Sequence, residues 1–151
     1  MPDLYSEKLI AVNMEADSKD SAIEQLIRML EKDNRINSLS EFRDSIYERE
    51  NESTTEVGEY TAIPHGRSET VNENSVCIAT LKKPVMWNFE TKEEIDIIFM
   101  LAVKKDSTDT HIEILSELAS KIMEEDFILN IKNAHNKNEI YNIITEKEDS
   151  E

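Results

Sequence analysis

The sequence predicts an α/β fold in which a mixed, mostly parallel β-sheet is sandwiched between α-helices. Three observations lead to this prediction. Apolar residues at helical spacing mark helices, and short apolar runs mark strands. The order along the chain is one strand, two helices, further strands and three helices. The run Ile95–Val103 is nearly all apolar, which is typical of a strand covered on both faces, so we expect helices on both sides of the sheet.

The N-terminal part is expected to contain one strand and two helices. The apolar run Leu9–Met14 predicts the strand, and a helix capped by Asp17 follows it to about residue 32. A second helix begins at Ser38, which forms a capping-box pattern with Glu41, and it ends near residue 50. Its buried face is expected to consist of Leu39, Phe42 and Ile46.

The middle of the chain is expected to supply the other strands. Residues 51–60 are polar and are expected to be irregular, and a short strand over Thr61–Ile63 then runs into Pro64. The residues after Pro64, up to residue 75, are expected to form a polar loop. Two longer strands follow, Val76–Leu81 and Ile95–Val103.

Three helices are expected to complete the chain. The first is capped by Thr110, with Glu113 three residues later, and runs to about residue 123. Two short helices lie near 126–133 and 138–145, and the acidic tail 146–151 is expected to fray. The chain has no internal repeat and no Gly/Pro/Ser-rich linker, so we expect residues 1–151 to form one domain.

Composition limits the classes of partner. The chain has 17 basic and 33 acidic residues and a net charge of −16. Such a chain is repelled by nucleic acid and by anionic lipid, and it attracts basic proteins; alternatively, the charge only maintains solubility. Cys77 is the only cysteine, which excludes a disulfide framework, and it is expected to be a small buried hydrophobe.

No segment has the pattern of a membrane span or of a signal peptide. The N-terminus MPDLYSEKLI lacks a basic region followed by an apolar run, and the longest uninterrupted apolar run has seven residues, Ile97–Val103. We therefore expect a cytoplasmic protein without direct membrane insertion.

The most informative motif is Pro64-His65-Gly66, because the chain has only three prolines and two glycines. Pro64 fixes φ and Gly66 permits turns closed to other residues, so His65 is expected at a constrained bend. A neutral imidazole held there is a suitable nucleophile near neutral pH. The alternative is a turn histidine without chemistry.

Two other residues favour an anion site. Arg49 lies seven positions after Phe42, on the inward side of its helix near the end, where an unpaired charge is costly. A phosphate would satisfy it by two hydrogen bonds, although one of the many carboxylates would also do so. His111 lies in the first turn of a helix, where it either packs in the core or faces an anion.

Other kinds of site have weaker support. His65 and His111 could join a carboxylate in a metal site, but no closely spaced ligand pair such as HxxxH occurs. The nucleotide-binding motifs GxxxxGK[ST] and GxGxxG are absent, as is the hydrolase motif GxSxG. His135 is expected to be exposed, and Trp87 is expected to be a core anchor.

These residues together resemble a known family. The segment AIPHGR at 62–67, preceded by RENESTTEVGEY from Arg49, is similar to the enzyme IIA domains of the fructose and mannitol class of the bacterial sugar phosphotransferase system. The similarity continues through PVMW at 84–87, IDIIFMLAV at 95–103 and HIEILSELASKI at 111–122. It covers most of the chain.

The resemblance implies specific roles and partners. His65 matches the histidine that takes a phosphoryl group from the histidine phosphocarrier protein. It then gives the group to a sugar-specific IIB domain, which acts with a membrane IIC component. Arg49 matches the arginine that steadies the phosphate, and His111 matches the second active-site histidine. Thr55 matches the threonine of the preceding loop, and we expect it to bind the phosphate together with Arg49. The resemblance implies no metal and no cofactor. The alternative is a regulatory module of the same fold, in which phosphorylation of His65 controls binding to a transcriptional or metabolic protein.

Overall fold

The computed structural model describes residues 3–106 and 108–145. These residues include a six-stranded sheet. The strand order is β1-β5-β6-β3-β2, and β4 also pairs with β6. The strands are β1 (Ile10–Met14), β2 (Glu56–Gly58), β3 (Thr61–Ala62), β4 (His65–Ser68), β5 (Ser75–Asn88) and β6 (Glu93–Lys104). Three of the five pairings are parallel, whereas β2–β3 and the long β5–β6 hairpin are antiparallel. The predicted mixed sheet is therefore confirmed, although its longest pairing is antiparallel.

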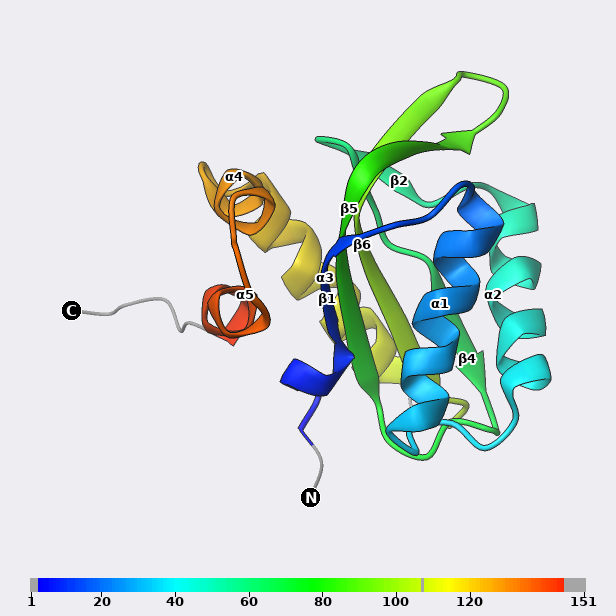
Figure 1. Ribbon diagram of the computed structural model, residues 1–151. Coiled ribbons are helices and arrows are strands. Elements are labelled where there is room, and N and C mark those ends of the chain that lie inside the picture. The colour runs from blue at the N-terminus through cyan, green and yellow to red at the C-terminus, as the bar shows by residue number, and fades with distance from the viewer. Residues whose placement is uncertain (1–2, 107, 146–151) are drawn as a thin grey trace.

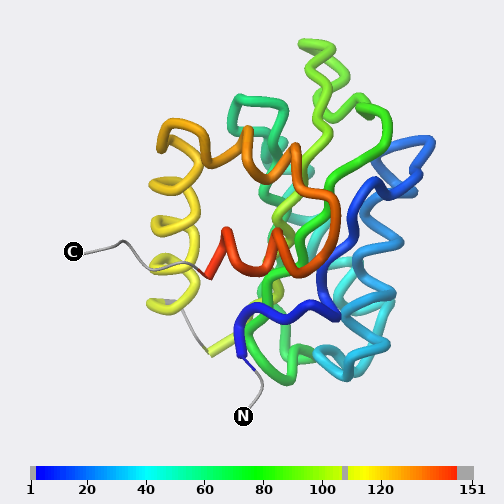
Figure 2. Tube along the Cα trace, turned by 60° about the vertical axis from the view of Figure 1, so that its left-hand side comes forward, coloured from blue at the N-terminus to red at the C-terminus, as the bar shows by residue number. Residues whose placement is uncertain are grey.

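Helices cover both faces of the sheet, as the sequence predicted (Figure 1). One layer consists of α1 (Lys19–Lys32) and α2 (Leu39–Glu52). The other consists of α3 (Thr108–Met123), α4 (Phe127–Lys132) and α5 (Lys137–Thr145). Figure 2 shows these last three helices following one another on their side of the sheet, with α5 in contact with β1. A short 3₁₀ turn, Glu7–Leu9, precedes β1.

Two hydrophobic cores lie on the two faces of the sheet because successive side chains of a strand point to opposite faces. Along β6, Ile98, Met100 and Ala102 belong to the core under α1 and α2, and their neighbours Ile97, Phe99 and Leu101 belong to the core under α3 to α5. This explains the continuous apolar run in the sequence.

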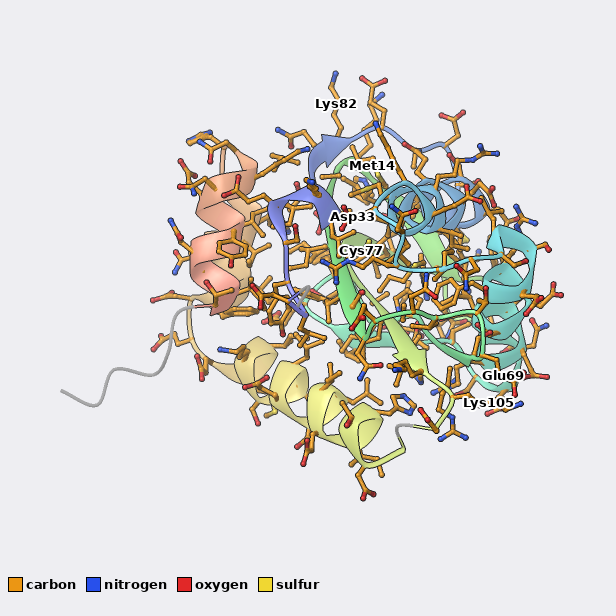
Figure 3. All side chains as sticks on the ribbon, turned by 90° about the horizontal axis from the view of Figure 1, so that it is seen from below. Met14, Asp33, Glu69, Cys77, Lys82 and Lys105 are labelled. Atoms are coloured by element: carbon orange, nitrogen blue, oxygen red, sulfur yellow. The ribbon has the colours of Figure 1, made fainter. Side chains whose placement is uncertain are left out.

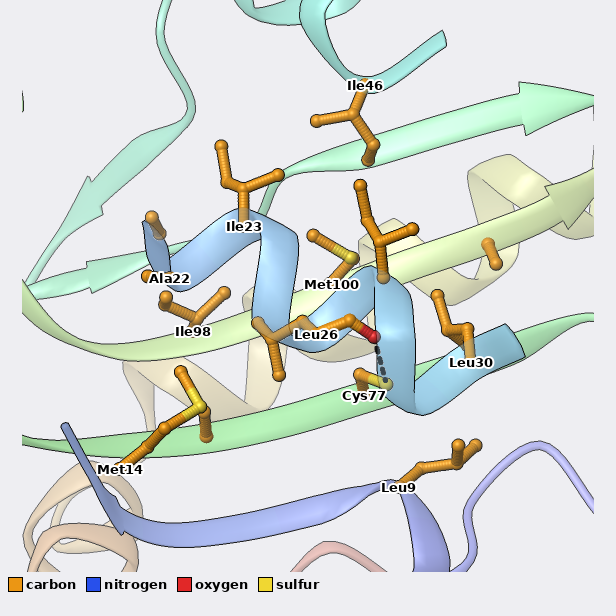
Figure 4. Close-up of a cluster of buried hydrophobic side chains, with 14 of the residues drawn as sticks. Leu9, Met14, Ala22, Ile23, Leu26, Leu30, Ile46, Cys77, Ile98 and Met100 are labelled. Atoms are coloured by element: carbon orange, nitrogen blue, oxygen red, sulfur yellow. Dashed lines mark hydrogen bonds between the residues drawn. The ribbon is translucent and has the colours of Figure 1, made fainter. Parts of the chain in front are cut away.

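Cys77 lies inside the core under α1 and is fully buried, as expected (Figure 4). Its Sγ donates a weak hydrogen bond to the carbonyl oxygen of Leu26 at 3.7 Å. In Figure 3, Cys77 lies at the centre of the molecule, whereas Lys82 and Lys105 lie at its periphery. Burial raises the pKa of the Cys77 thiol, which makes it unreactive.

Several predicted boundaries are wrong. The cap of α1 is Ser18, whose hydroxyl accepts from the Ser21 amide, and not Asp17. The helix α3 begins at Thr108, so Thr110 lies inside its first turn and is not the residue that precedes the helix. The cap of α2 is Ser38, as expected. The strands β5 and β6 are longer than predicted because they form one hairpin, which projects beyond the helices in Figure 1. The predicted frayed tail, 146–151, lies outside the described residues.

Part of the expected polar loops is β-structure. Residues 56–58 form β2, within the segment that was expected to be irregular. His65–Ser68 form β4, which pairs in parallel with Leu101–Lys104 of β6. His65 is therefore the first residue of an extended strand and does not lie at a bend. This strand was not recognised because its four residues are all polar or glycine, so they show no alternation of apolar and polar side chains.

Gly66 is required in β4 for close approach to α2. A Cβ atom at this position would lie 2.2 Å from Ser45 Oγ and 3.0 Å from Phe42 Cε1. Only a residue without a side chain lets the strand and the helix pack at this distance. The glycine of the motif thus serves packing and not a turn.

We expect Gly66→Ala to destabilise the fold by about 1–3 kcal/mol, because it forces an extra methyl group into a filled space. The measurement is the free energy of unfolding by urea. Ser45→Ala removes the closest contact, so the double variant Ser45→Ala/Gly66→Ala should recover part of the loss relative to the Ser45→Ala variant. Equal destabilisation by Gly66→Ala in both backgrounds would contradict this explanation.

Candidate functional site

His65 is the centre of the candidate site. It is 9% exposed, and because Gly66 faces α2, His65 points to the opposite face, toward α3. Its Nδ1 lies 2.9 Å from the carbonyl oxygen of Ile63. A carbonyl can only accept, so Nδ1 carries the proton and Nε2 is unprotonated, with a lone pair. The backbone before the histidine therefore selects the tautomer of its ring.

Arg49 lies beside that lone pair. Its Nε–H donates to His65 Nε2 at 3.1 Å, and its Nη1 donates to the Ser53 carbonyl oxygen at 2.7 Å. The side chain is only partly buried, near the end of α2, so the sequence correctly predicted its place but overstated its burial. The rest of the guanidinium can face an anion bound next to His65.

His111 brings a second ring to the site from the first turn of α3. The centroids of the His65 and His111 rings are 5.1 Å apart, with 53° between their planes. His111 Nε2 is buried and, among the described residues, has no hydrogen-bond partner. A buried ring nitrogen in this state is costly unless a ligand supplies the partner. The structure thus brings Arg49, His65 and His111 together.

Thr55 does not face this group through its hydroxyl. It is 5% exposed, its Oγ1 donates to a carboxylate oxygen of Glu50, and it accepts from Trp87 Nε1 at 3.3 Å. Its carbonyl oxygen accepts from the Ile63 amide at 3.0 Å. Thr55 therefore contacts the strand that leads to His65, and its side chain belongs to a buried polar cluster.

Sequence reasoning missed two members of that cluster, Lys19 and Glu50. Their charged groups form an ion pair of 2.9 Å, and both residues are nearly buried. Glu50 lies four residues after Ile46, so the helical spacing that identified the apolar face of α2 also places Glu50 on it. The position of the Glu50 carboxylate on the apolar face of α2 was the pattern that could have indicated a buried polar cluster.

The pKa values of both histidines in the site lie below the ordinary value of 6.5. Burial is the largest cause for His65, and the Arg49 charge adds to it, partly opposed by the Ile63 carbonyl and by Glu50. For His111 burial is again the largest cause, followed by the charges of His65, Arg67 and Arg49. Both rings are therefore neutral near neutral pH, in a locally positive part of an acidic protein.

The lowered pKa of His65 has a consequence for the pH dependence of any reaction in which Nε2 is a nucleophile. Because only the neutral ring has a nucleophilic lone pair, the rate should fall on acidification with a midpoint below pH 6.5. The measurement is the pH profile of the initial rate of His65 modification, compared with an NMR titration of the ring. A rate that halves at or above pH 6.5 would contradict this expectation.

The other sequence expectations concern residues away from the site. His135 is exposed and Trp87 is fully buried, as expected. Within residues 3–106 and 108–145, no three histidine, cysteine or acidic side chains gather in a group that could hold a metal ion. In the same part of the chain, no helix is both long and apolar enough to cross a membrane.

Comparisons with known proteins agree on one family. The family model "Phosphoenolpyruvate-dependent sugar phosphotransferase system, EIIA 2" matches residues 3–147. The chain is 27% identical over 144 residues to the PTS system fructose-specific EIIABC component of Bacillus subtilis. That alignment covers 95% of this chain but only 23% of the relative.

Solved structures are similar over nearly the whole chain. The nitrogen regulatory protein IIA-Ntr from Neisseria meningitidis has a TM-score of 0.86 and 26% identity, with 94% of this chain and 97% of that chain covered. The complex of enzyme IIA-mannitol and phosphorylated enzyme IIB-mannitol from Escherichia coli has a TM-score of 0.81. At 19% identity, with 95% and 100% of the two chains covered, it shows the shared fold. The chain belongs to the EIIA 2 family of the phosphoenolpyruvate-dependent sugar phosphotransferase system.

Proposed function

We propose that this chain carries a phosphoryl group on His65. It accepts the group from the histidine phosphocarrier protein and passes it to a sugar-specific IIB domain, which acts with a membrane IIC component. The observation that carries the proposal is the state of the His65 ring. Nδ1 is protonated and held by the Ile63 carbonyl, so that the lone pair of Nε2 is available next to a guanidinium.

In this reaction the lone pair of His65 Nε2 forms a bond to phosphorus while the nitrogen–phosphorus bond of the donor breaks. The donor ring, protonated on its other nitrogen, leaves as neutral imidazole with the electron pair of the broken bond. The His65 ring becomes more positive as the bond forms, and the Ile63 carbonyl, which accepts from Nδ1–H, stabilises that charge. No proton has to leave the ring, so the step needs neither a base nor a metal.

Arg49 and His111 are proposed to bind the transferred group. Charge in phosphoryl transfer accumulates on the equatorial oxygens, where fixed donors act best. The guanidinium of Arg49 gives up its hydrogen bond to Nε2 and takes two of these oxygens. His111, whose Nε2 lacks a partner among the described residues, donates to a third when it carries its proton on that atom. Thr55 supports the backbone before His65 and does not touch the phosphoryl group.

The test is incubation with phosphoenolpyruvate and the purified phosphocarrier system. We expect an acid-labile label on this protein, and a ³¹P NMR signal of Nε2-phosphohistidine. Addition of IIB domains should then discharge the label from this protein onto one of them. Absence of label would overturn the proposal, and the Nδ1 isomer would overturn the assignment of the reacting nitrogen.

A second candidate function is regulatory. The likeness to the nitrogen regulatory protein IIA-Ntr favours it, because that structure is similar over the whole domain. Here the same phosphorylation of His65 controls binding to a transcriptional or metabolic protein, and no sugar is moved. Discharge to a sugar-specific IIB domain separates the two functions. A phosphorylated protein that transfers to no IIB domain encoded in its genome would favour the regulatory function.

A further inference from the structure

A buried polar cluster links α1, α2 and β5 behind the candidate site. Lys19 Nζ lies 2.9 Å from Glu50 Oε1, donates to the Trp87 carbonyl oxygen at 3.2 Å, and lies 4.7 Å above the Trp87 ring. The second oxygen of Glu50 accepts from the Thr55 hydroxyl, which in turn accepts from Trp87 Nε1. Four side chains, from the start of α1, the end of α2, the loop that follows and β5, thus contact one another, and Thr55 is bonded to two of them.

The cluster reaches His65 through backbone hydrogen bonds. The Thr55 carbonyl accepts from the Ile63 amide at 3.0 Å, and the Ile63 carbonyl faces His65 Nδ1 at 2.9 Å. The same loop also meets Arg49, because the Ser53 carbonyl accepts from its guanidinium. The position of residues 53–55 therefore affects both the tautomer of His65 and the direction of the Arg49 fork.

A buried ion pair such as Lys19–Glu50 is weak evidence for a contribution to stability. Taking two charges out of water costs several kcal/mol for each ion, and apolar side chains of similar volume in place of such a pair are often neutral or stabilising. The pair occupies the edge of a well-packed core that includes Ile46 and Trp87. The presence of this costly ion pair at the edge of the core would be explained if its hydrogen bonds position residues of the candidate site.

We propose that the Lys19–Glu50 ion pair is a positioning element. Through Thr55 and Ile63 it holds the His65 imidazole in the tautomer in which Nδ1 is protonated and Nε2 is not. The link to phosphoryl transfer rests on the proposed function, whereas the tautomer is a property of the free protein. Neither Lys19 nor Glu50 touches the reacting atoms.

The main test compares the wild type with the double variant Lys19→Met/Glu50→Leu, which replaces the pair by apolar side chains. We expect ¹⁵N NMR to show a mixture of His65 tautomers in the variant and the Nδ1–H form alone in the wild type. The single-turnover rate of phosphorylation should fall by about tenfold or more, as misplacement by about 1 Å can produce. The affinity for the phosphocarrier should not change, because the pair is buried.

The control is Glu52→Gln. Glu52 is exposed and, like Glu50, raises the pKa of His65 through its charge. Its removal tests the effect of one lost negative charge without disturbing the cluster. We expect the tautomer of His65 to be unchanged and the rate to stay within about twofold of the wild type, since an exposed charge acts weakly. A tautomer change equal to that of the double variant would overturn the positioning role.

A second pair of variants keeps the test valid if the double variant does not fold. Thr55→Val removes the hydroxyl that joins Glu50 to Trp87, and Thr55→Ser restores it. We expect mixed tautomers and slow transfer in the first and wild-type behaviour in the second. If Thr55 instead binds phosphate directly, Thr55→Val slows transfer while the tautomer of the free protein is unchanged, which would overturn the inference.

Failure of the inference and failure of the proposed function have different signatures. A wild type that accepts no phosphoryl group contradicts the function, while the NMR comparison still tests the positioning role. A wild type that is phosphorylated, together with cluster variants of equal rate and equal tautomer, contradicts the inference alone.

Discussion

Replacing His65 with alanine is expected to abolish acid-labile phosphorylation completely, because the variant lacks the nitrogen that forms the bond to phosphorus. The side chain packs between Arg49 and His111 and is nearly buried, so His65→Gln is the better variant for keeping the shape of the site. The measurement is the incorporation of label from phosphoenolpyruvate through the phosphocarrier system. Circular dichroism of each variant establishes that it is folded.

The chain offers a matched control for this experiment in His135, which is exposed and distant in sequence from the site. We expect His135→Ala to be labelled like the wild type. His111→Ala should still be labelled, but more slowly, because it loses a proposed contact to the phosphoryl oxygens and keeps the nucleophile. Undiminished label in His65→Gln, or loss of label in His135→Ala, would show that the reacting residue has been misassigned.

Arg49→Ala is expected to have the second largest effect. It removes the guanidinium beside His65 Nε2 and the contact to the Ser53 carbonyl. Loss of one fixed donor to a developing negative charge typically costs about 10²–10³-fold in rate, and we expect a loss of that order. The measurement is the single-turnover rate of phosphorylation by the phosphorylated carrier, at saturating carrier concentration.

Arg49→Lys tests whether geometry or charge accounts for the effect. Lysine keeps the positive charge but has no planar fork for two phosphoryl oxygens, so we expect it to recover only a small part of the lost rate. The pKa of His65 supplies a second readout, since the Arg49 charge lowers it; the pKa should rise in Arg49→Ala and should rise less in Arg49→Lys. Full activity of the alanine variant would refute the proposed role.

Much of the fold could be predicted from spacing alone. The helices α1, α2, α4 and α5 and the strand β1 follow apolar patterns of local origin, and the buried runs in β5 and β6 predicted a sheet covered on both faces. The strand β4 could not be predicted, because its conformation depends on pairing with β6 and on a close contact with α2, both distant in sequence. Tertiary pairing decides such short polar strands.

The sequence suggested three site residues, but none of them implied one chemistry by itself. A histidine between proline and glycine, an arginine at the end of an amphipathic helix and a histidine in a first helical turn were each ambiguous alone, and the structure brings all three together. The role of Thr55 was not accessible, because its hydroxyl partners Glu50 and Trp87 are set by the packing of α2 against β5. Lys19, at the start of α1, gave no local signal at all.

The parallel pairing of β4 with β6 affects how freely the site can move. All four residues of β4 are paired with β6, and the Leu101 amide donates to the Pro64 carbonyl just before the strand. Pairing along the whole of β4 fixes the backbone of His65 relative to β6. The backbone of His65 therefore has less freedom than that of a loop residue. In the proposed function, the donor and the acceptor each bring their reactive group to the nitrogen of a backbone held in the sheet.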